Sequence, residues 1–406
     1  MRILYLQYAN PAGYPPIEHS SRILAGKGWQ VTILGIGALG KADSLEFPPH
    51  PNIQVRRLPF CPPGWGQKLH FLRFAFWAFL WLFRWRPQWI YASDMLACPA
   101  ALALSYWPGV RVAYHEHDLP ADPSNSPPAS TAIRFAFWAR EKLARRAAFC
   151  IVPNDQRGRH LADQTRTTTP VISVWNCPSL EEVLTEGNPG ASQDPRVAIS
   201  SFPRPTKRGE GNLVLFYHGT IVPVRLPLAV LSALAQLPEN ILLRFAGYET
   251  IGHPGYVDEI RAETARLGLS SRVEYLGAVP QRAELLAQCR NSDIGLAFMP
   301  GNARDPNEQS MAGASNKAFE YMACGLALLV SDLPDWKRMF VEPGYGLACD
   351  PEDPASLAKA LRWFIAHPEA ARQMGARGRK RIADEWNYES RFDPVVQRLC
   401  KPENLF

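Results

Sequence analysis

The chain of 406 residues lacks the cysteine and leader patterns that mark several protein classes. Its eight cysteines include no CxxC pair, so the sequence offers neither a zinc motif nor a dithiol redox motif. The first residues, MRILYLQYANPAGY, contain no apolar leader core and no cleavage site for secretion. We therefore expect reduced, mostly buried thiols and a cytoplasmic location.

The most apolar segment lacks the length of a transmembrane helix, which needs about 20 residues. Its unbroken apolar run covers only residues 74–83. The run lies inside residues 47–93, which contain six basic residues and no acidic one. Two interpretations of residues 68–86 stay open. Basic residues beside aromatic ones indicate a helix on an anionic membrane surface, whereas apolar side chains on nearly every face indicate a helix buried in a domain core.

A second segment, residues 133–149, repeats the mixture of aromatic and basic side chains. Residues 1–185 carry a net charge of +7, whereas residues 186–406 carry −1. This asymmetry favours an anionic membrane as a partner of the first half, with the protein peripheral on the inner face of that membrane. We expect no nucleic-acid partner, because no nucleic-acid-binding motif accompanies the charge.

Short apolar segments alternate with helical patterns along the chain, which predicts an α/β fold with parallel sheets covered on both faces. We expect a first domain over residues 1–186, a linker rich in Gly, Pro and Ser over 187–210, and a second domain over 211–385. Residues 386–406 have the pattern of a terminal helix. The loop after the first strand contains Gly13 but no GxGxxG pattern, so the dinucleotide fingerprint is absent.

Residues 315–332, SNKAFEYMACGLALLVSD, are the most informative run. Four small or polar residues lead into a short helical pattern: Gly313, Ala314, Ser315 and Asn316. Gly325 then stops the helix, and an apolar strand follows. A loop feeding a helix N-terminus offers N–H groups and a favourable dipole to a phosphate or diphosphate. Glu320, one turn into the helix, could accept hydrogen bonds from the vicinal hydroxyls of a ribose. The alternative is an ordinary αβ unit with a surface glutamate.

This run resembles the NKxxEYMAxGxxxxxSD signature of glycosyltransferase family 4, a large group of retaining enzymes with the GT-B fold. The resemblance implies two doubly wound, Rossmann-like domains that face each other across a cleft, with the donor on the second domain and the acceptor on the first. It implies that Glu320 holds the ribose of a nucleotide sugar, and that the loop 313–316 lies against the diphosphate and the sugar. It also implies that the helix 386–406 packs back on the first domain.

The segment YHEHDLP, residues 114–120, resembles the family's YDxHE segment, with His117 at the histidine and Asp118 at the acidic position. His115 replaces the usual aspartate. The resemblance implies that His117 orients the donor sugar by hydrogen bonding and that the loop at Gly13 approaches the sugar and acceptor. Two alternatives stay open for His117: a loop histidine satisfied by its neighbours, or a zinc ligand paired with His115.

The segment HGTIVPVRLP, residues 218–227, resembles the family's GxLxxxRG segment, with Gly219 early in it and Arg225 on the basic position. Arg225 would clamp the diphosphate, and Lys317 would supply a second cation. A departing nucleoside diphosphate develops negative charge, which fixed cations and helix N–H groups stabilise. We therefore expect neither a metal ion nor another cofactor. The alternative for Arg225 is a solvated loop charge.

One further match concerns the nucleotide, and one departure from the family pattern concerns the sugar. Residues 273–289 resemble the family segment whose backbone, here near Val279, contacts the base. Many members carry a second glutamate eight residues before Glu320, and Ala312 stands there in this chain. Three nearby polar residues are candidates for the sugar hydroxyls instead: Asp305, Glu308 and Ser310.

Taken with the resemblance, the sequence predicts a retaining glycosyltransferase that moves a sugar from a nucleotide-diphosphate sugar to a glycan or lipid-linked acceptor. Surface polysaccharide or glycolipid synthesis is the expected context. The implied reaction takes place on one face of the sugar, and the leaving phosphate helps to deprotonate the acceptor. Two rivals stay open: a sugar-nucleotide epimerase of the same fold, and a non-catalytic nucleotide-binding relative, which Ala312 supports.

Overall fold

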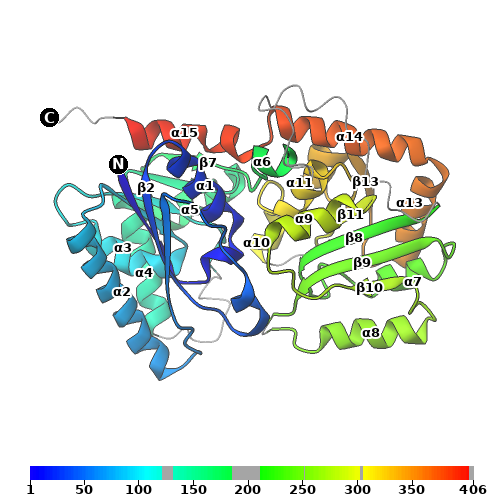
Figure 1. The fold of residues 1–406 in the computed structure, drawn as a ribbon, viewed down its shortest axis with the longest axis horizontal. Helices are drawn as coiled ribbons and strands as arrows, with labels where there is room; N and C mark the ends of the chain where they lie inside the picture. The colour runs from blue at the N-terminus through cyan, green and yellow to red at the C-terminus, as the bar shows by residue number, and fades with distance from the viewer. Residues whose placement is uncertain (121–130, 185–210, 251, 302–304, 402–406) are drawn as a thin grey trace. The chain divides into compact units, whose positions relative to one another are not determined.

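The computed structural model describes residues 1–120, 131–184, 211–250, 252–301 and 305–401, and the linker predicted over 187–210 lies outside these ranges. The chain divides into two units, each with a sheet and a core of its own (Figure 1). The first unit contains Met1–Asn176, Asp305–Ala314 and Tyr388–Phe406. The second contains Cys177–Arg304 and Ser315–Asn387.

The first unit is built on a parallel sheet of seven strands in the order β3-β2-β1-β4-β5-β6-β7. The strands are β1 (Arg2–Gln7), β2 (Gln30–Ile36), β3 (Ile53–Leu58), β4 (Trp89–Ser93), β5 (Arg111–His115), β6 (Phe149–Val152) and β7 (Val171–Ser173). Successive side chains of β1 serve opposite faces: Ile3 and Tyr5 enter one core cluster, and Leu4 and Leu6 enter the other. The strand is therefore apolar almost throughout, as the covering of both faces requires.

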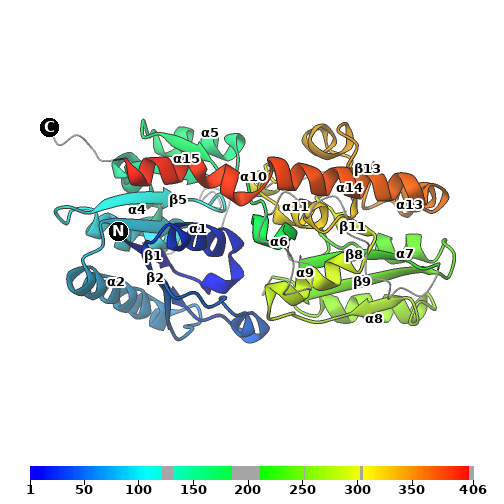
Figure 2. The ribbon, with the colours of Figure 1, turned by 45° about the horizontal axis from the view of Figure 1, so that its top comes forward.

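Helices cover both faces of this sheet (Figures 1 and 2). Side chains of α1 (Pro15–Gly26) and α15 (Tyr388–Cys400) enter the core of one face. The core of the other face takes side chains from α2 (Trp65–Trp85), α3 (Cys98–Leu104), α4 (Thr131–Arg146) and α5 (Asp155–Thr165). The terminal helix α15 is tied to α1 by Tyr388, whose hydroxyl donates to the carbonyl oxygen of Pro16 at 3.2 Å.

Residues 305–314 differ from the sequence-based division, which assigned them to the second domain. They include the short helix α10 (Pro306–Gln309) and pack with the first unit. The amide nitrogen of Asn154 donates to the carbonyl oxygens of Ser310 and Ala312 at 2.8 and 2.7 Å. Asn307 exchanges two hydrogen bonds with the backbone of Leu119. These hydrogen bonds join residues far apart in the sequence, so no local sequence pattern predicts them.

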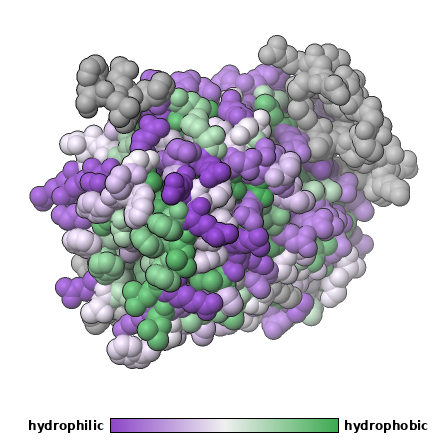
Figure 3. Space-filling model, turned by 60° about the vertical axis from the view of Figure 1, so that its left-hand side comes forward, coloured by the Kyte–Doolittle hydropathy of each residue, from purple (hydrophilic) through white to green (hydrophobic). Residues whose placement is uncertain are grey.

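Helix α2 is buried along one side only, so the interpretation of a helix buried in a domain core is right for that side and wrong for the other. Its buried side chains are Phe74, Ala78 and Leu82. Seven large apolar side chains of the helix are exposed: Trp65, Leu69, Leu72, Phe76, Phe79, Leu80 and Phe83. We call these seven residues the apolar stripe. Figure 3 turns the side of α2 forward and shows hydrophobic residues gathered there beside hydrophilic ones. Within the described ranges, no helix combines the length and apolarity needed to cross a bilayer.

The second unit is built on a parallel sheet of six strands in the order β10-β9-β8-β11-β12-β13. The strands are β8 (Leu213–Thr220), β9 (Ile241–Tyr248), β10 (Val273–Tyr275), β11 (Ile294–Ala297), β12 (Ala327–Ser331) and β13 (Gly346–Cys349). The helices are α6 (Leu180–Leu184), α7 (Ala229–Leu234), α8 (Tyr256–Arg266), α9 (Arg282–Arg290), α11 (Asn316–Ala323), α12 (Pro334–Trp336), α13 (Pro354–Ala366) and α14 (Pro368–Asp384). Lys337–Val341 forms a π-helical turn after α12.

Candidate functional site

Polar residues gather at the carboxyl ends of β4 and β5 in the first unit. Ser93 ends β4 and pairs in register with His115, the last residue of β5. The Nε2 atom of His117 lies 2.9 Å from the hydroxyl oxygen of Ser93. The backbone N–H of His117 donates to Oδ1 of Asp94 at 2.9 Å. Parallel strands bring their carboxyl ends to one edge of the sheet, so these loops meet where ligands bind in open α/β folds.

Asp94 holds this group together in an unusual backbone conformation. Its φ of 65° and ψ of 167° lie in a region that residues other than glycine rarely adopt. Its own N–H donates to the carbonyl oxygen of His115 at 2.8 Å, so Asp94 ties the loop after β4 to the end of β5. Burial, together with the negative charge of Asp118, raises the pKa of Asp94 to about 7. The backbone hydrogen bond from His117 partly offsets this rise.

His117 is a buried and neutral imidazole. Burial lowers its pKa to about 4, with a partly opposing effect of Asp118 and a further lowering by Arg157. The Nδ1 atom of His117 has no hydrogen-bond partner within the described residues. A neutral ring with one nitrogen unpaired suits hydrogen bonding to a hydroxyl group, which is the role that the family resemblance implies. Of the two ring nitrogens, only Nε2 has the partner that the alternative of a satisfied loop histidine requires.

The neighbours of His117 have structural partners. The ring of His115 lies against it, tilted by 41°, at a centroid distance of 3.8 Å, and His115 Nδ1 lies 2.5 Å from the hydroxyl of Tyr91. Glu116 forms a buried ion pair with Arg140, whose Nη2 donates to Oε1 at 2.7 Å. In the part of the chain that the structure describes, no three His, Cys, Asp or Glu side chains are grouped to hold a metal ion, so the zinc alternative gains no third ligand.

The loop after β1 lies beside His117. The turn Pro11–Gly13 is capped by Asn10, whose side chain accepts from the N–H of Ala12 at 3.2 Å. The ring of Tyr14 lies 5.6 Å from that of His117 between centroids. A Cβ atom on Gly13 would meet only Leu45 Cδ1, at 3.8 Å, and no positive φ is recorded there. The structure therefore does not require glycine at this position.

The predicted phosphate loop, residues 313–316, begins with the last residues of segment 305–314 of the first unit and leads into α11 of the second. Gly313 has φ +81°, and a Cβ atom there would lie 3.3 Å from the indole of Trp175, so glycine fits best. The carbonyl oxygens of Gly313 and Ala314 accept hydrogen bonds from Asn176. Ser315 occupies the N-cap position without a side-chain cap hydrogen bond. The first turn of α11 thus presents N–H groups that no capping side chain satisfies, as an anion site needs.

Glu320 lies at the centre of a buried ionic cluster, so the alternative of a surface glutamate is wrong. Its side chain has no exposed surface. Its Oε1 atom lies 2.6 Å from Arg282 Nη2 and accepts from the amide of Asn316 at 2.7 Å. Its Oε2 atom lies 3.0 Å from His218 Nε2. Arg282 also pairs with Glu182. A ligand hydroxyl reaches this carboxylate only if one of its partners moves.

The charge of Glu320 is fixed by these partners. Burial alone would raise the pKa of the carboxyl, but Arg282, His218 and the hydrogen bond from Asn316 hold the pKa well below its usual range. The group is therefore an anion at neutral pH. An anion with oxygen lone pairs is the acceptor that ribose hydroxyls would need.

Two cations lie near the start of α11 and the end of β8. Lys317 is half-buried, and its Nζ lies 5.8 Å from the ring centroid of Tyr217. Burial, followed by the charge of Arg225, lowers the pKa of Lys317 to about 8, and Glu320 partly opposes this. Gly219 has φ +110°, and a Cβ atom there would lie 2.9 Å from Lys317 Cε. Glycine at 219 therefore makes room for the lysine.

Arg225 is half-buried, and its Nη1 lies 3.5 Å from the carbonyl oxygen of Phe298. Since its charge lowers the pKa of Lys317, the two cations repel each other. An anion between them would relieve that repulsion, which fits a diphosphate better than a solvated loop charge. Val279, predicted to contact the base, lies half-buried in the loop after β10.

The polar residues upstream of the signature have local partners. The side chain of Asp305 accepts from the N–H of Asn307 at 2.9 Å and caps α10. The hydroxyl of Ser310 donates to the carbonyl oxygen of Pro306 at 2.6 Å. Glu308 is half-buried. Ala312, at the position of the usual second glutamate, contributes its carbonyl oxygen to the contact with Asn154.

Sequence reasoning missed several residues of these clusters. Asp94 and His218 stand at carboxyl ends of strands, so the rule for open α/β sheets was the signal that could have found them. Arg282 begins α9 and carries no comparable local signal. Its link to Glu320 is a tertiary contact, and so is the burial of Arg157 against residues 305–314.

Comparisons with known proteins agree with this architecture. Residues 17–175 match the family model described as glycosyl transferase 4-like domain, and residues 229–397 match the model described as glycosyl transferase-like. A search of curated protein sequences found no significant match.

Solved structures similar to this chain include sucrose-phosphate synthase from Thermosynechococcus elongatus, at 16% identity and a TM-score of 0.68, with 98% of each chain covered. Anabaena HepE in complex with UDP and glucose has the same identity and TM-score, with 98% of this chain and 99% of that one covered. WaaG, a glycosyltransferase involved in lipopolysaccharide biosynthesis, has 14% identity and a TM-score of 0.61, with 98% and 100% covered.

Proposed function

Because the chain belongs to the GT-B glycosyltransferases of family 4, which transfer a sugar from a nucleotide sugar, we propose that it is a retaining enzyme acting on a glycan or lipid-linked acceptor. The proposed context is the synthesis of a surface polysaccharide or glycolipid. The proposed donor site is supported by one group of features at α11. The N-terminus of the helix has no capping side chain, Lys317 and Arg225 lie beside it, and anionic Glu320 lies one turn further along.

In the proposed reaction, the diphosphate of the donor binds at the first turn of α11 and between Lys317 and Arg225. Charge grows on the diphosphate as the bond to the sugar breaks, and the cations and helix N–H groups stabilise that charge. Glu320 accepts hydrogen bonds from the ribose after its buried partners rearrange. The acceptor attacks from the face that the diphosphate leaves, and the leaving phosphate takes its proton. His117 orients the sugar by hydrogen bonding.

We propose that the reaction needs no metal ion, because Lys317 and Arg225 supply the positive charge that a divalent cation would otherwise provide. Full activity after exhaustive treatment with a chelator is the expected result. Loss of activity that a divalent cation restores would contradict this proposal.

The donor and acceptor classes are proposals supported by the structural neighbours. HepE has been solved with UDP-glucose, so UDP-glucose is the first donor to test. The role of WaaG in lipopolysaccharide biosynthesis supports a glycan or lipid-linked acceptor.

We further propose that the first unit lies on the inner face of an anionic membrane through residues 68–86 and 133–149, where a lipid-linked acceptor is available. The exposed apolar stripe of α2 supports this, together with exposed Ile133, Phe135 and Trp138 on α4. A soluble core helix would not leave so many large apolar side chains in water.

The test is a screen of nucleotide sugars by thermal shift, followed by product analysis. A donor at 100 times its dissociation constant should stabilise the protein by about 2.7 kcal/mol. The stabilising donor is then incubated with and without candidate acceptors. Transfer predicts that nucleoside diphosphate release depends on the acceptor. An epimer formed from the donor alone would favour an epimerase, and tight binding without turnover across the acceptor panel would favour a non-catalytic relative.

A further inference from the structure

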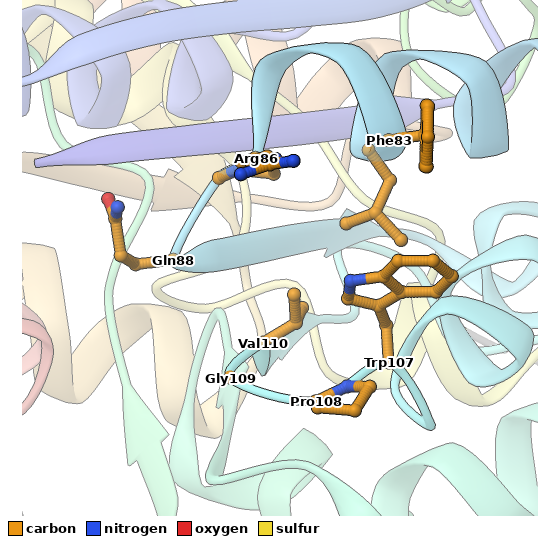
Figure 4. Close-up of a pocket in the computed structure, with 9 residues that line it drawn as sticks. Phe83, Arg86, Gln88, Trp107, Pro108, Gly109 and Val110 are labelled. Carbon is orange, nitrogen blue, oxygen red and sulfur yellow. The ribbon is translucent and has the colours of Figure 1, made fainter.

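A pocket of about 310 Å³ opens at the amino ends of β4 and β5 in the first unit. It is lined by the end of α2 (Leu82, Phe83, Arg86), by Pro87 and Gln88 before β4, and by the turn 107–110 before β5. In Figure 4, Arg86 lies above the pocket and Trp107 below it, with the indole nitrogen toward the side of Gln88 and Val110. An always-charged guanidinium and an indole N–H thus border one apolar recess.

This pocket is separate from the candidate site of the same unit. Asp94 and His117 follow the carboxyl ends of β4 and β5, whereas Gln88 and Val110 precede the amino ends of these strands. A strand of five residues spans roughly 16 Å, so a ligand in the pocket cannot be the group that His117 contacts. The pocket is therefore no part of the reaction centre.

The pocket continues the apolar stripe of α2. Six of the stripe residues recur at intervals of three and four, with Leu80 directly after Phe79, which places the stripe on one side of a helix. The last of them, Phe83, is 59% exposed and borders the pocket. Trp107 packs edge-on against both Phe79 and Phe83, with ring centroids 5.8 and 6.3 Å apart. The apolar stripe and the pocket therefore form one continuous surface.

The charged side chains of α2 and of the segment before it are all basic. Arg73, Arg84 and Arg86 are exposed, and residues 47–93 contain no acidic residue. Arg146 stacks over exposed Tyr106, next to Trp107, at 4.0 Å. A second copy of the chain is a poor occupant, because a two-fold contact through the stripe would bring these arginines against each other. An anionic bilayer complements both the apolar stripe and its basic border.

We propose that the pocket between Arg86 and Trp107 binds the phosphate-bearing headgroup of an anionic phospholipid while the apolar stripe lies among the acyl chains. The bound lipid is an anchor rather than an acceptor, and it fixes which side of the first unit faces the membrane. The inference rests on the proposed membrane attachment and adds a discrete headgroup site to it.

The test compares two arginines that lie two residues apart. Arg84→Gln removes one exposed charge outside the pocket, and Arg86→Gln removes one from its lining. Binding is measured by co-sedimentation with vesicles of phosphatidylcholine, with and without phosphatidylglycerol. We expect the wild type to bind only the anionic vesicles. Arg84→Gln should weaken binding about fivefold, as a diffuse surface charge does. Arg86→Gln should weaken it at least tenfold, because charge-assisted hydrogen bonds to phosphate are also lost.

A second variant removes any doubt about folding. Arg86 ends α2 with φ +50°, a conformation that glycine adopts more readily, so Arg86→Gly should fold and still lose the headgroup. Trp107→Phe keeps the aromatic area and removes the indole donor, and it should bind less tightly than the wild type. Thermal stabilisation by the donor sugar nucleotide should be unchanged in every variant.

Three results would overturn the inference. Equal losses for Arg84→Gln and Arg86→Gln would mean a diffuse basic surface without a headgroup site. Competition by inorganic phosphate, at an ionic strength matched with chloride, would mean a site for free phosphate rather than lipid. Failure of the wild type to bind either vesicle would remove the membrane attachment as well, while donor binding and acceptor-dependent transfer would still be judged by their own assays.

Discussion

Replacing Glu320 by alanine removes a carboxylate that is fully buried and has three partners inside the second unit. Breaking a buried ion pair by removing one partner typically destabilises a protein by about 3–5 kcal/mol. Arg282 is 15% exposed and keeps Glu182 as a second partner, so we expect about 3 kcal/mol, at the lower end of that range. The place of Glu320 on the signature helix predicts weaker donor binding without unfolding of the protein, and the burial of its side chain adds a loss of stability to that expectation.

Glu320→Gln separates the two effects. Glutamine has nearly the same shape and can still accept from Asn316, so less stability should be lost than with alanine. The charged acceptor for ribose hydroxyls is nevertheless gone, which should weaken donor binding by about 1.5–3 kcal/mol, or roughly 10- to 150-fold. In the wild type, the ionised carboxylate contributes its full share of the folding stability above the ordinary pKa of 4.5. This share is lost only as the pH falls through the lower pKa of the folded state.

Calorimetric titration with the donor and denaturant unfolding measure the two quantities. Glu369→Gln is the matched control, since it removes the same charge from an exposed pair with Arg372 on α14. The control should leave donor affinity and unfolding free energy as in the wild type. If Glu320→Gln binds the donor as tightly as the control does, Glu320 is a structural residue and the ribose assignment fails.

Three further predictions concern the charges of the two clusters. Arg225→Ala should lower kcat more than donor affinity, because charge on the diphosphate grows in the transition state; a retained kcat with a raised KM would mean that Arg225 only binds. Donor affinity should fall as the pH rises through about 8, where Lys317 loses its proton, and Lys317→Arg should flatten that profile in calorimetry; an unaltered profile would contradict the role of this lysine. The pKa of Asp94 is about 7 in the folded protein and 3.8 in the unfolded chain, so protonated Asp94 contributes fully to the folding stability below pH 3.8. That contribution is lost as the pH rises through about 7. The unfolding free energy of the wild type should therefore fall relative to Asp94→Asn between pH 5 and 8, and parallel curves would refute the shift.

The signature run was predictable because its signals are local. A polar start, a short helical pattern and Gly325 predict a helix followed by a strand, which are α11 and β12 in the structure, and Gly325 has the positive φ that a helix stop needs. The doubly wound fold follows from the same kind of information, since apolar strands alternate with helices along both halves. The sequence pattern thus placed Glu320 and Lys317 correctly on α11.

The surroundings of these residues were not predictable in the same way. Arg282, His218 and Glu182 come from three separate elements, and only the packed unit brings them to Glu320. The segment 305–314 follows a strand of the second unit yet packs with the first, through hydrogen bonds to residues about 150 positions earlier. Local propensity carries no information about such partners.

Helix α2 shows why an apolar pattern can leave its environment open. Phe74, Ala78 and Leu82 recur with the period of a helix, and so does the apolar stripe on another side. A helix that is apolar on both sides can pack either side against the core, so the hydrophobic pattern alone does not determine which side is buried. The three-dimensional packing decides it, because α2 meets the sheet along one side only. The large residues on the other side, in a segment with arginines and no acidic residue, then indicate what kind of partner that side binds.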